Sequence, residues 1–408
     1  MKTIAIIVGA RPNFVKAAAL CAAAVSYSKR VKIEIIHTGQ HYSDELSTIF
    51  FEQFNMPKLY ANLNIGSNDR ITTTHLIMER LTNTLKELKP DMVVVIGDVT
   101  STVAAAMTAV SLGIPVAHVE AGLRSRNWRM NEEVNRVMVD HISSLLFATE
   151  VEGVMNLQKE GVDMSRVYLV GNTMIDTLNL FEGIAENSSV LERLQVLPYS
   201  YVLATLHRAE NVDDVPRLLE LYGALCDIHA KCPVILPLHP RTKLALERAG
   251  VVIDSRFSPI IVEPQSYLDF FKLQRYARCI VTDSGGIQEE ASVIGVPVLT
   301  VRTETERPIT IEYGTNEMVG VSREKIGEAA TRALKGQWKR RKAVIPFWDG
   351  KAGERIMAII DKALHEGNVT MPEVIAQTVP KVVVAAPPIT HNQDILSLLL
   401  EKNKEAAR

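Results

Sequence analysis

Short apolar runs that end in a polar residue alternate with helical stretches along the 408-residue chain, and this alternation narrows its possible folds more than any other feature. Met92–Ile96 is apolar throughout and rich in β-branched residues, which is typical of a strand buried on both faces of a parallel sheet. Strands that alternate with helices predict βαβ units and an α/β fold. The other strands expected in the first half are Ile4–Val8, Val31–Ile36, Leu145–Ala148 and Val167–Val170.

The second half repeats the order of the first. VVVIGD (Val93–Asp98) is followed by a helical stretch and then by GIPVAHVEAG (Gly113–Gly122). Likewise, CIVTD (Cys279–Asp283) is followed by a helix of small residues and then by GVPVLTVRTE (Gly295–Glu304). This internal echo predicts two similar units, and we expect two Rossmann-like domains with a central cleft. The further strands expected here are Tyr201–Leu206, Val234–Leu238 and Ile260–Val262.

The chain is too long for one ordinary domain of about 100–200 residues, so two domains are expected. We place the first at 1–176 and the second at 177–365, with the last helix of the second free to pack back on the first domain. The boundary is expected near Asp176–Ser200, because Glu186–Ser189 and Pro198 resemble a linker. The tail, 366–408, shows little periodicity and is interpreted as an extension without assigned chemistry.

Composition excludes several classes of protein. The formal net charge of −2 gives no basic excess for nucleic acid or an anionic membrane. No apolar stretch approaches the roughly 18 residues of a membrane-spanning helix, and the N-terminal apolar run is too short for a signal peptide. The four cysteines are scattered without metal-binding spacing, which favours free thiols and a cytoplasmic location.

The first strand-to-helix junction, VGARPNFVK, carries two cations. Gly9 is expected to allow a tight turn after the strand. Arg11 and Lys16 follow it at the carboxyl edge of the predicted sheet, where ligands bind in open α/β folds. Two cations there suit a diphosphate, although ordinary surface cations would give the same pattern.

A sharper phosphate signal is VTDSGGIQEEA. We expect a strand that ends at Asp283, a tight loop of Ser284, Gly285 and Gly286, and then a helix. Backbone N–H groups of such a glycine loop at a helix N-terminus bind phosphate, and Ser284 adds a hydroxyl. Glu290 lies about one turn further on, where its carboxylate suits ribose hydroxyls.

Three carboxylates lie at or near strand ends of the first half. Asp98 ends VVVIGD, Glu120 ends VAHVE, and Glu132 belongs to NEEVNR, with Arg136 one helical turn later. Each alone is more often a cap or an ion-pair partner. If they converge on one cleft, their mutual repulsion suits general acid–base catalysis.

Polar residues also follow strands of the second half. His207 and Arg208 end one strand, and His239 ends the next. Two histidines at the carboxyl ends of successive strands favour a ligand site over an isolated structural histidine. Arg307 belongs to a dense polar segment, RTETERP, that either lines the cleft or braces its loop.

These motifs together resemble a known family. GARPNFVK, HVEAGLRS, EEVNR, HRAEN, DSGGIQEEA and TERP occur in the order seen in non-hydrolysing UDP-N-acetylglucosamine 2-epimerases, over about residues 1–365. The resemblance implies a glycosyltransferase-B type architecture, a homodimer, a UDP-sugar substrate, and neither a metal nor a nicotinamide cofactor. The expected reaction is reversible inversion of carbon 2 of UDP-N-acetylglucosamine through loss and re-addition of UDP, which supplies precursors of cell-surface polysaccharides or glycans.

The resemblance also implies roles for individual residues. Acid–base roles fall to the carboxylates, with one histidine assisting: Asp98, Glu120, Glu132 and His207. Contacts to UDP and its phosphates fall to Arg11, His207, Ser284, Gly285, Gly286 and Glu290, and control of the charges around them falls to Lys16 and Arg136. From their positions in the second half, we also expect His239 and Arg307 to bind the substrate.

The chain departs from many bacterial members at three places. Asn13 replaces a glutamate, Ala209 replaces a second arginine, and the segment 40–44 replaces one that helps hold a second, activating substrate in some members. Related diacetamido-uronic acid epimerases open with a similar GARPxF, so that sugar is a second possible substrate. Three further activities compete with epimerisation as interpretations of the chain: a glycosyltransferase of the same fold, a hydrolysing epimerase and a non-catalytic UDP-sugar sensor.

Overall fold

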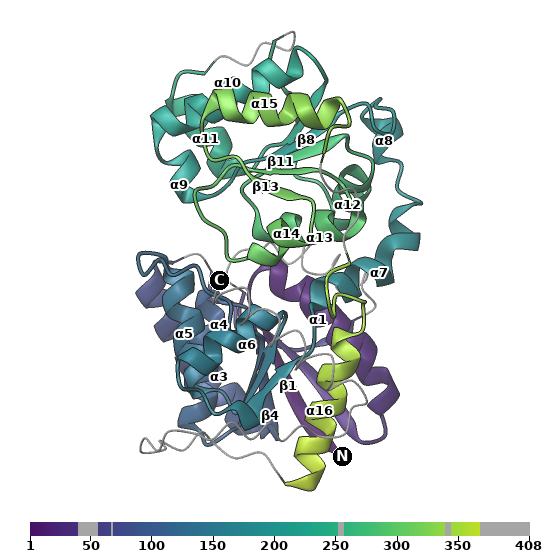
Figure 1. The fold of residues 1–408 in the computed structure, drawn as a ribbon. Helices are drawn as coiled ribbons and strands as arrows, with labels where there is room; N and C mark the ends of the chain where they lie inside the picture. The colour runs from purple at the N-terminus through teal and green to yellow at the C-terminus, as the bar shows by residue number, and fades with distance from the viewer. Residues whose placement is uncertain (40–55, 67, 252–256, 339–343, 368–408) are drawn as a thin grey trace. The chain divides into compact units, whose positions relative to one another are not determined.

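The computed structural model describes residues 1–39, 56–66, 68–251, 257–338 and 344–367. They form two compact units (Figure 1). The first unit comprises Met1–Thr177 together with the described residues from Phe347 onward, and the second comprises Leu178–Pro346. The departures at Gln40–Asp44 and the extension beyond residue 367 lie outside the described residues.

The first unit is built on a seven-stranded parallel sheet with the order β3-β2-β1-β4-β5-β6-β7. Its strands are β1 (Lys2–Val8), β2 (Val31–His37), β3 (Leu59–Asn62), β4 (Met92–Ile96), β5 (Val116–Ala121), β6 (Leu145–Ala148) and β7 (Val167–Leu169). Its α-helices are α1 (Arg11–Ala24), α3 (Arg70–Leu88), α4 (Thr100–Ser111), α5 (Asn131–Ile142), α6 (Val151–Lys159) and α16 (Ala352–Glu366). Short 3-10 helices cover Val25–Tyr27 and Met164–Arg166.

The second unit is built on a six-stranded parallel sheet with the order β10-β9-β8-β11-β12-β13. Its strands are β8 (Val202–Thr205), β9 (Val234–Pro237), β10 (Ile260–Val262), β11 (Cys279–Thr282), β12 (Val298–Thr300) and β13 (Asn316–Met318). Its helices are α8 (Val190–Arg193), α9 (Ala209–Val212), α10 (Val215–His229), α11 (Pro240–Arg248), α12 (Tyr267–Arg275), α13 (Gly285–Ile294), α14 (Pro308–Glu312) and α15 (Arg323–Leu334).

The two sheets share one topology, which confirms the two Rossmann-like units predicted from the internal echo. In each, the first three strands run outward in one direction and the fourth returns to the other side of the first. The strands β4 and β11 therefore occupy equivalent positions in the two sheets. Each is followed by the aspartate of the echoed motif, Asp98 or Asp283. The switch points where ligands are expected lie between β1 and β4, and between β8 and β11.

Strand residues of both sheets alternate between two helical layers. In β8, Val202 and Ala204 pack with α10 and α15, whereas Leu203 packs with α12 and α13, which cover the other face of the sheet (Figure 1). In β1, Ala5 and Ile7 pack in the same way with α3, α4 and α5. Burial on both faces explains why the central strands are continuous apolar runs.

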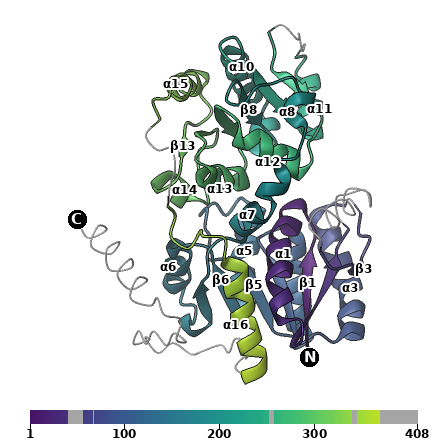
Figure 2. The ribbon, with the colours of Figure 1, turned by 90° about the vertical axis from the view of Figure 1, so that its right-hand side faces the viewer.

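The described residues from Phe347 onward belong to the first unit. The expected range 177–365 assigned them to the second domain but allowed the last helix to pack back on the first, as it does. The reason is that α16 packs beside α1 (Figure 2). Asp176 accepts hydrogen bonds from the backbone N–H groups of Ala352 (3.1 Å) and Gly353 (2.6 Å) at the start of α16. Burial is the main cause that raises the pKa of Asp176 to about 6.

The division between the units falls between Thr177 and Leu178, one residue from the expected boundary of 176/177. It lies inside helix α7 (Thr173–Ala185) and not in the linker-like segment Glu186–Ser189. Thr177 bonds through its hydroxyl to the carbonyl of Val15 (2.6 Å), which anchors the start of this helix in the first unit. A regular helix therefore carries the chain from one unit into the other.

Candidate functional site

Asn13 links the ends of the two strands, β1 and β4, that flank the switch point of the first unit. Its side-chain oxygen accepts from the N–H groups of Gly9 (3.3 Å) and Ala10 (3.1 Å), just after β1. Its amide nitrogen donates to the carbonyl of Ile96 (2.9 Å), at the end of β4. Asn13 therefore ties the two strand ends together. Gly9 is needed for close packing, because a Cβ there would lie 2.1 Å from the Ser101 hydroxyl.

Glu120 and Lys16 form a buried ion pair beside this switch point. The Lys16 ammonium lies 2.6 Å from the Glu120 carboxylate, and the two side chains are 8% and 3% exposed. Glu120 has a φ of 74°, and the β5–β6 register shifts between Val119 and Ala121. A non-glycine residue held in the left-handed region is strained, and such strain concentrates at functional sites. Lys16 is thus the ion-pair partner of Glu120, and its role toward the substrate stays a prediction.

Asp98, which follows β4, is held by α5. Its carboxylate pairs with the guanidinium of Arg136, and its backbone carbonyl accepts from the Asn135 amide (2.7 Å). Arg136 also pairs with Glu133. The sequence suggested Glu132 as the helical neighbour of Arg136, but helix rotation turns Glu133 toward the guanidinium. Glu132 is half-buried in the first turn of α5 and makes no ion pair with the described residues.

Sequence reasoning missed Glu133. Its buried carboxylate accepts from the N–H and hydroxyl of Ser125 (2.9 and 3.0 Å) and from the N–H of Arg126 (2.8 Å). It therefore fixes the loop that leaves β5 as well as Arg136. The adjacent pair of glutamates in NEEVNR was the available signal, but the pair alone does not show which carboxylate faces the protein.

Asp283 organises the switch point of the second unit, and it was expected only as a strand end. The buried carboxylate accepts from the N–H groups of His207 (3.0 Å) and Arg208 (2.9 Å) and from the Asn211 amide (3.2 Å). Burial acts to raise its pKa, but hydrogen bonds and charge from His207 outweigh this and lower the pKa. The ionised carboxylate therefore accepts from Nδ1 of His207 at 2.9 Å. Nε2 is the His207 nitrogen left for a ligand.

His239 lies beside His207, with 6.0 Å between the ring centroids. It is the N-cap of α11, where its Nδ1 accepts from the N–H of Arg241 (3.2 Å). Burial first, and then the charges of His207 and Arg241, lower the pKa of His239. A neutral His239 with Nδ1 as acceptor carries its proton on Nε2, and that nitrogen suits a phosphate oxygen.

Ser284 is the N-cap of α13, and its side chain makes no capping hydrogen bond. The helix begins at Gly285, so Gly285 and Gly286 lie in its first turn and not in the loop that the sequence predicted. The N–H groups of a first helical turn have no partner within the helix and favour an anion. A Cβ at Gly285 would meet nothing within 4 Å, so this helix start is open.

Two other residues that were predicted to contact UDP make side-chain bonds within the second unit. Glu290 accepts from the Tyr267 hydroxyl (3.1 Å) and the Gln274 amide (2.6 Å). Arg307 pairs with the buried Glu289. Their contacts with UDP stay predictions. The remaining expected contact, Arg11, is the first residue of α1, and its side chain is outside the described part of the structure.

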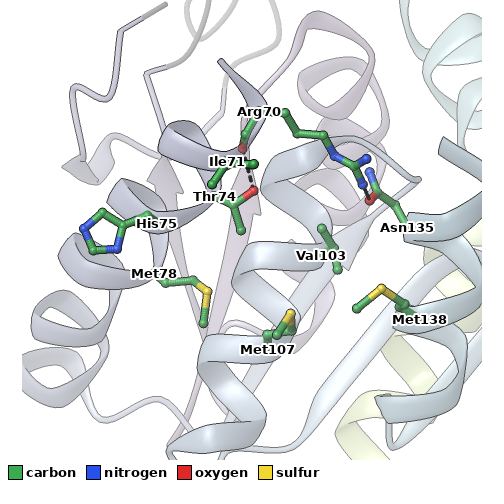
Figure 3. Close-up of a pocket in the computed structure, with 9 residues that line it drawn as sticks. All are labelled: Arg70, Ile71, Thr74, His75, Met78, Val103, Met107, Asn135 and Met138. Carbon is green, nitrogen blue, oxygen red and sulfur yellow. Dashed lines mark hydrogen bonds between the residues drawn. The ribbon is translucent and has the colours of Figure 1, made fainter. Parts of the chain in front are cut away.

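A surface hollow of about 450 Å³ lies between α3, α4 and α5 of the first unit (Figure 3). It is largely apolar and is lined by Arg70, Ile71, Thr74, His75, Met78, Val103, Met107, Asn135 and Met138. It contains none of the predicted site residues, but Asn135 belongs both to this lining and to the contacts of Asp98.

Two features are absent from the described residues. None of their helices is long and apolar enough to cross a membrane. No group of three or more His, Cys, Asp or Glu side chains among them is arranged to hold a metal ion.

The fold and the two switch points define a two-unit α/β protein, with Asp98 and Glu120 at the switch point of one unit and an open helix start at that of the other. A family model described as UDP-N-acetylglucosamine 2-epimerase matches residues 23–361. The UDP-N-acetylglucosamine 2-epimerase of Methanocaldococcus jannaschii is 41% identical over 367 residues, which are 88% of this chain and 98% of that protein. The chain therefore belongs to the UDP-N-acetylglucosamine 2-epimerase family, a family of isomerases.

Among the other similar proteins, one is named for a different sugar and two solved structures contain UDP-GlcNAc. The UDP-2,3-diacetamido-2,3-dideoxy-D-glucuronate 2-epimerase of Pseudomonas aeruginosa is 40% identical over 80% of this chain and 91% of its own. The crystal structure of the M. jannaschii enzyme with UDP-GlcNAc and UDP has a TM-score of 0.81 at 41% identity, and it covers 88% of this chain and 99% of its own. The Neisseria meningitidis enzyme bound to UDP-GlcNAc also has a TM-score of 0.81, at 29% identity, with 89% and 100% of the chains covered.

Proposed function

We propose that this protein reversibly inverts carbon 2 of UDP-N-acetylglucosamine to give UDP-N-acetylmannosamine. The observation that carries this proposal is the pairing of Asp98 with Arg136 and of Glu120 with Lys16, at one edge of one sheet. Proton transfer at carbon 2 needs carboxylates of this kind, whereas binding alone does not.

The first half of the reaction removes UDP and a proton. Carbon 2 has no neighbouring carbonyl, so its hydrogen is too weakly acidic for direct removal. When the bond from C1 to the diphosphate oxygen breaks, UDP leaves with the electron pair and C1 gains oxocarbenium character. A carboxylate then takes the C2 proton, and a C1–C2 double bond forms in a 2-acetamidoglucal. The second half returns a proton to the opposite face of C2, and the UDP oxygen adds again to C1.

The groups of the second unit suit the departing diphosphate. The open start of α13 favours negative charge, and Nε2 of His207 and Nε2 of His239 are the ring nitrogens without a partner in the contacts above. Donors fixed in place before the reaction stabilise developing charge without reorganising. We therefore assign diphosphate binding to Ser284, Gly285, His207 and His239, and proton transfer to the first unit.

The related diacetamido-uronic acid is a second candidate substrate, because the P. aeruginosa enzyme is nearly as similar to this chain as the M. jannaschii enzyme is. A competition assay with both UDP-sugars at equal concentration decides between them. Faster turnover of the diacetamido-uronate would replace the substrate proposed here while leaving the chemistry at carbon 2 unchanged.

The decisive test is epimerisation in D₂O, followed by proton NMR. We expect deuterium at carbon 2 of UDP-N-acetylmannosamine, because the abstracted proton exchanges with solvent through a carboxylate before it returns. Retention of the original hydrogen would contradict elimination. Release of free N-acetylmannosamine would identify a hydrolysing enzyme, and transfer of the sugar to an added acceptor would identify a glycosyltransferase.

We further propose that the protein acts as a homodimer in the cytoplasm and supplies glycan precursors. The apolar hollow supports a dimer, since Ile71 on its rim is 81% exposed and Met138 is also exposed. Light scattering should give twice the chain mass for the wild type and the monomer mass for a variant with Ile71→Glu and Met138→Glu. An unchanged mass in that variant would exclude this face as the interface.

A further inference from the structure

His118 is fully buried in β5, two residues before Glu120, and both of its ring nitrogens face hydrogen-bond acceptors. Nε2 lies 2.8 Å from the backbone carbonyl of Gly97. Nδ1 lies 2.7 Å from the carboxylate of Asp140 on α5. A carbonyl oxygen only accepts, so Nε2 must carry a proton. Whether Nδ1 carries one depends on the state of Asp140.

Asp140 is held as a carboxylate by what surrounds it. One oxygen faces His118, and the other accepts from the N–H of Gly122 (3.1 Å) and pairs with Arg124 (2.8 Å). Burial acts to raise the pKa of Asp140, but His118 and Arg124 outweigh burial and lower it. Arg124 is in turn paired with Glu160 (2.7 Å). Nδ1 of His118 therefore faces a carboxylate that is also held by Gly122 and Arg124.

The two hydrogen bonds of His118 join the elements that carry the candidate acid–base groups. Gly97 precedes Asp98, and its N–H donates to the carbonyl of Val119 (2.9 Å), so both sides of this turn are fixed to β5. A Cβ at Gly97 would lie 3.4 Å from the Glu120 carboxylate, which shows how closely Glu120 approaches the turn.

The third candidate acid–base group, Glu132, is connected to His118 through helix α5. Asp140 is on the same helix as Glu132, Asn135 and Arg136, and the last two contact Asp98. The bond from His118 to Asp140 therefore fixes α5 against the strand that carries Glu120. One imidazole ring thus connects the turn before Asp98, the strand of Glu120 and the helix of Glu132.

We infer that His118 is a positioning residue of the active site, held between the Gly97 carbonyl and the Asp140 carboxylate, so that it sets the mutual placement of Asp98, Glu120 and Glu132. Its catalytic consequence rests on the function proposed above. Its two hydrogen bonds do not, so the two can be tested separately. His118 acts through other residues, and no contact with substrate is assigned to it.

The first test is ¹⁵N NMR of the full chain labelled at histidine. The ring N–H signal of His118 should exchange slowly with solvent, because the ring is fully buried and both nitrogens are in hydrogen bonds. The signal is assigned by its loss in His118→Gln or, should that chain not fold, by its displacement in Asp140→Asn. In Asp140→Asn the exchange should become faster, because the bond from Nδ1 to the carboxylate on α5 is lost. A ring proton of wild-type His118 that exchanges as fast as those of exposed histidines would overturn the inference.

The second test separates positioning from a merely structural role. His118→Gln should lower kcat about 10- to 100-fold, the scale of a small misplacement of catalytic groups. UDP affinity, measured by calorimetry, should stay within about twofold, because neither Gly97 nor Asp140, the residues that His118 contacts, is assigned to UDP. His141→Gln, an exposed histidine on the same helix α5, is the matched control and should keep wild-type kcat.

Two kinetic results would overturn the positioning role. One is a kcat near wild type in His118→Gln, and the other is a loss of UDP affinity as large as the loss of kcat. If the wild type itself shows no epimerisation, the proposed function fails, while the NMR result still decides whether His118 is held by hydrogen bonds on both sides.

Discussion

Replacing any one of the three carboxylates by its amide, in Asp98→Asn, Glu120→Gln or Glu132→Gln, should lower turnover by at least about 10²-fold, the usual scale for acid–base groups. An amide keeps the shape of the side chain but neither accepts nor returns a proton. UDP affinity should largely survive, because the groups assigned to the diphosphate lie in the second unit. Initial rates in both directions and calorimetric titration with UDP measure the two effects.

Glu79→Gln is the matched control for these variants, since Glu79 is an exposed carboxylate on α3 of the same unit. It should keep wild-type turnover. If the amide variant of one of the three carboxylates also keeps near-normal turnover, that residue is excluded as an acid–base group. Deuterium exchange at carbon 2 without net epimerisation in one variant would identify the carboxylate that returns the proton on the second face.

The sequence predicted the central strands well, because burial on both faces of a parallel sheet demands continuous apolar runs such as Met92–Ile96. It did not reveal β3 and β13, which are edge strands of three or four residues. Both contain asparagine, and their partial burial leaves no continuous apolar signal. The position of α16 was left open for another reason: an amphipathic helix shows which face is buried but not which unit buries it.

The sequence predicted where the candidate site residues lie in the fold, but not which residues they pair with. The rule that polar groups at the carboxyl ends of parallel strands meet at one edge located Asp98, Glu120 and His207 correctly. Their partners were not predictable, because pairing depends on helix rotation and on side-chain length. Arg136 thus pairs with Glu133 and not Glu132. The left-handed backbone of Glu120 also has no sequence signal, since strand residues normally avoid it.

Replacing Lys16 by methionine should destabilise the protein by about 3–5 kcal/mol, because it leaves the buried Glu120 carboxylate without the Lys16 ammonium. Glu120→Gln should destabilise it as well, since a buried ammonium then remains without that carboxylate. In the double variant no charge is left uncompensated, and most of the stability should return. Urea unfolding of all four proteins measures the coupling between the two residues.

The exposed pair of Lys2 and Asp91 is the control for this cycle. Its atoms are 2.8 Å apart, and its side chains are 39% and 31% exposed. Lys2→Met should therefore change stability by no more than about 1 kcal/mol. A similar small change in Lys16→Met, or a double variant as unstable as the sum of both single ones, would show that the buried pair is not coupled.

Activity should not follow stability in the double variant. A purely structural role for the pair requires turnover to return with stability, because the neutral pair restores the packing. A catalytic role for Glu120 requires turnover to remain at least about 10²-fold below wild type, since glutamine has no proton to exchange. Rates measured well below the unfolding midpoint of each variant separate the two cases. We expect the double variant to be stable and inactive, because the strained backbone of Glu120 is then still in place but its carboxylate is gone.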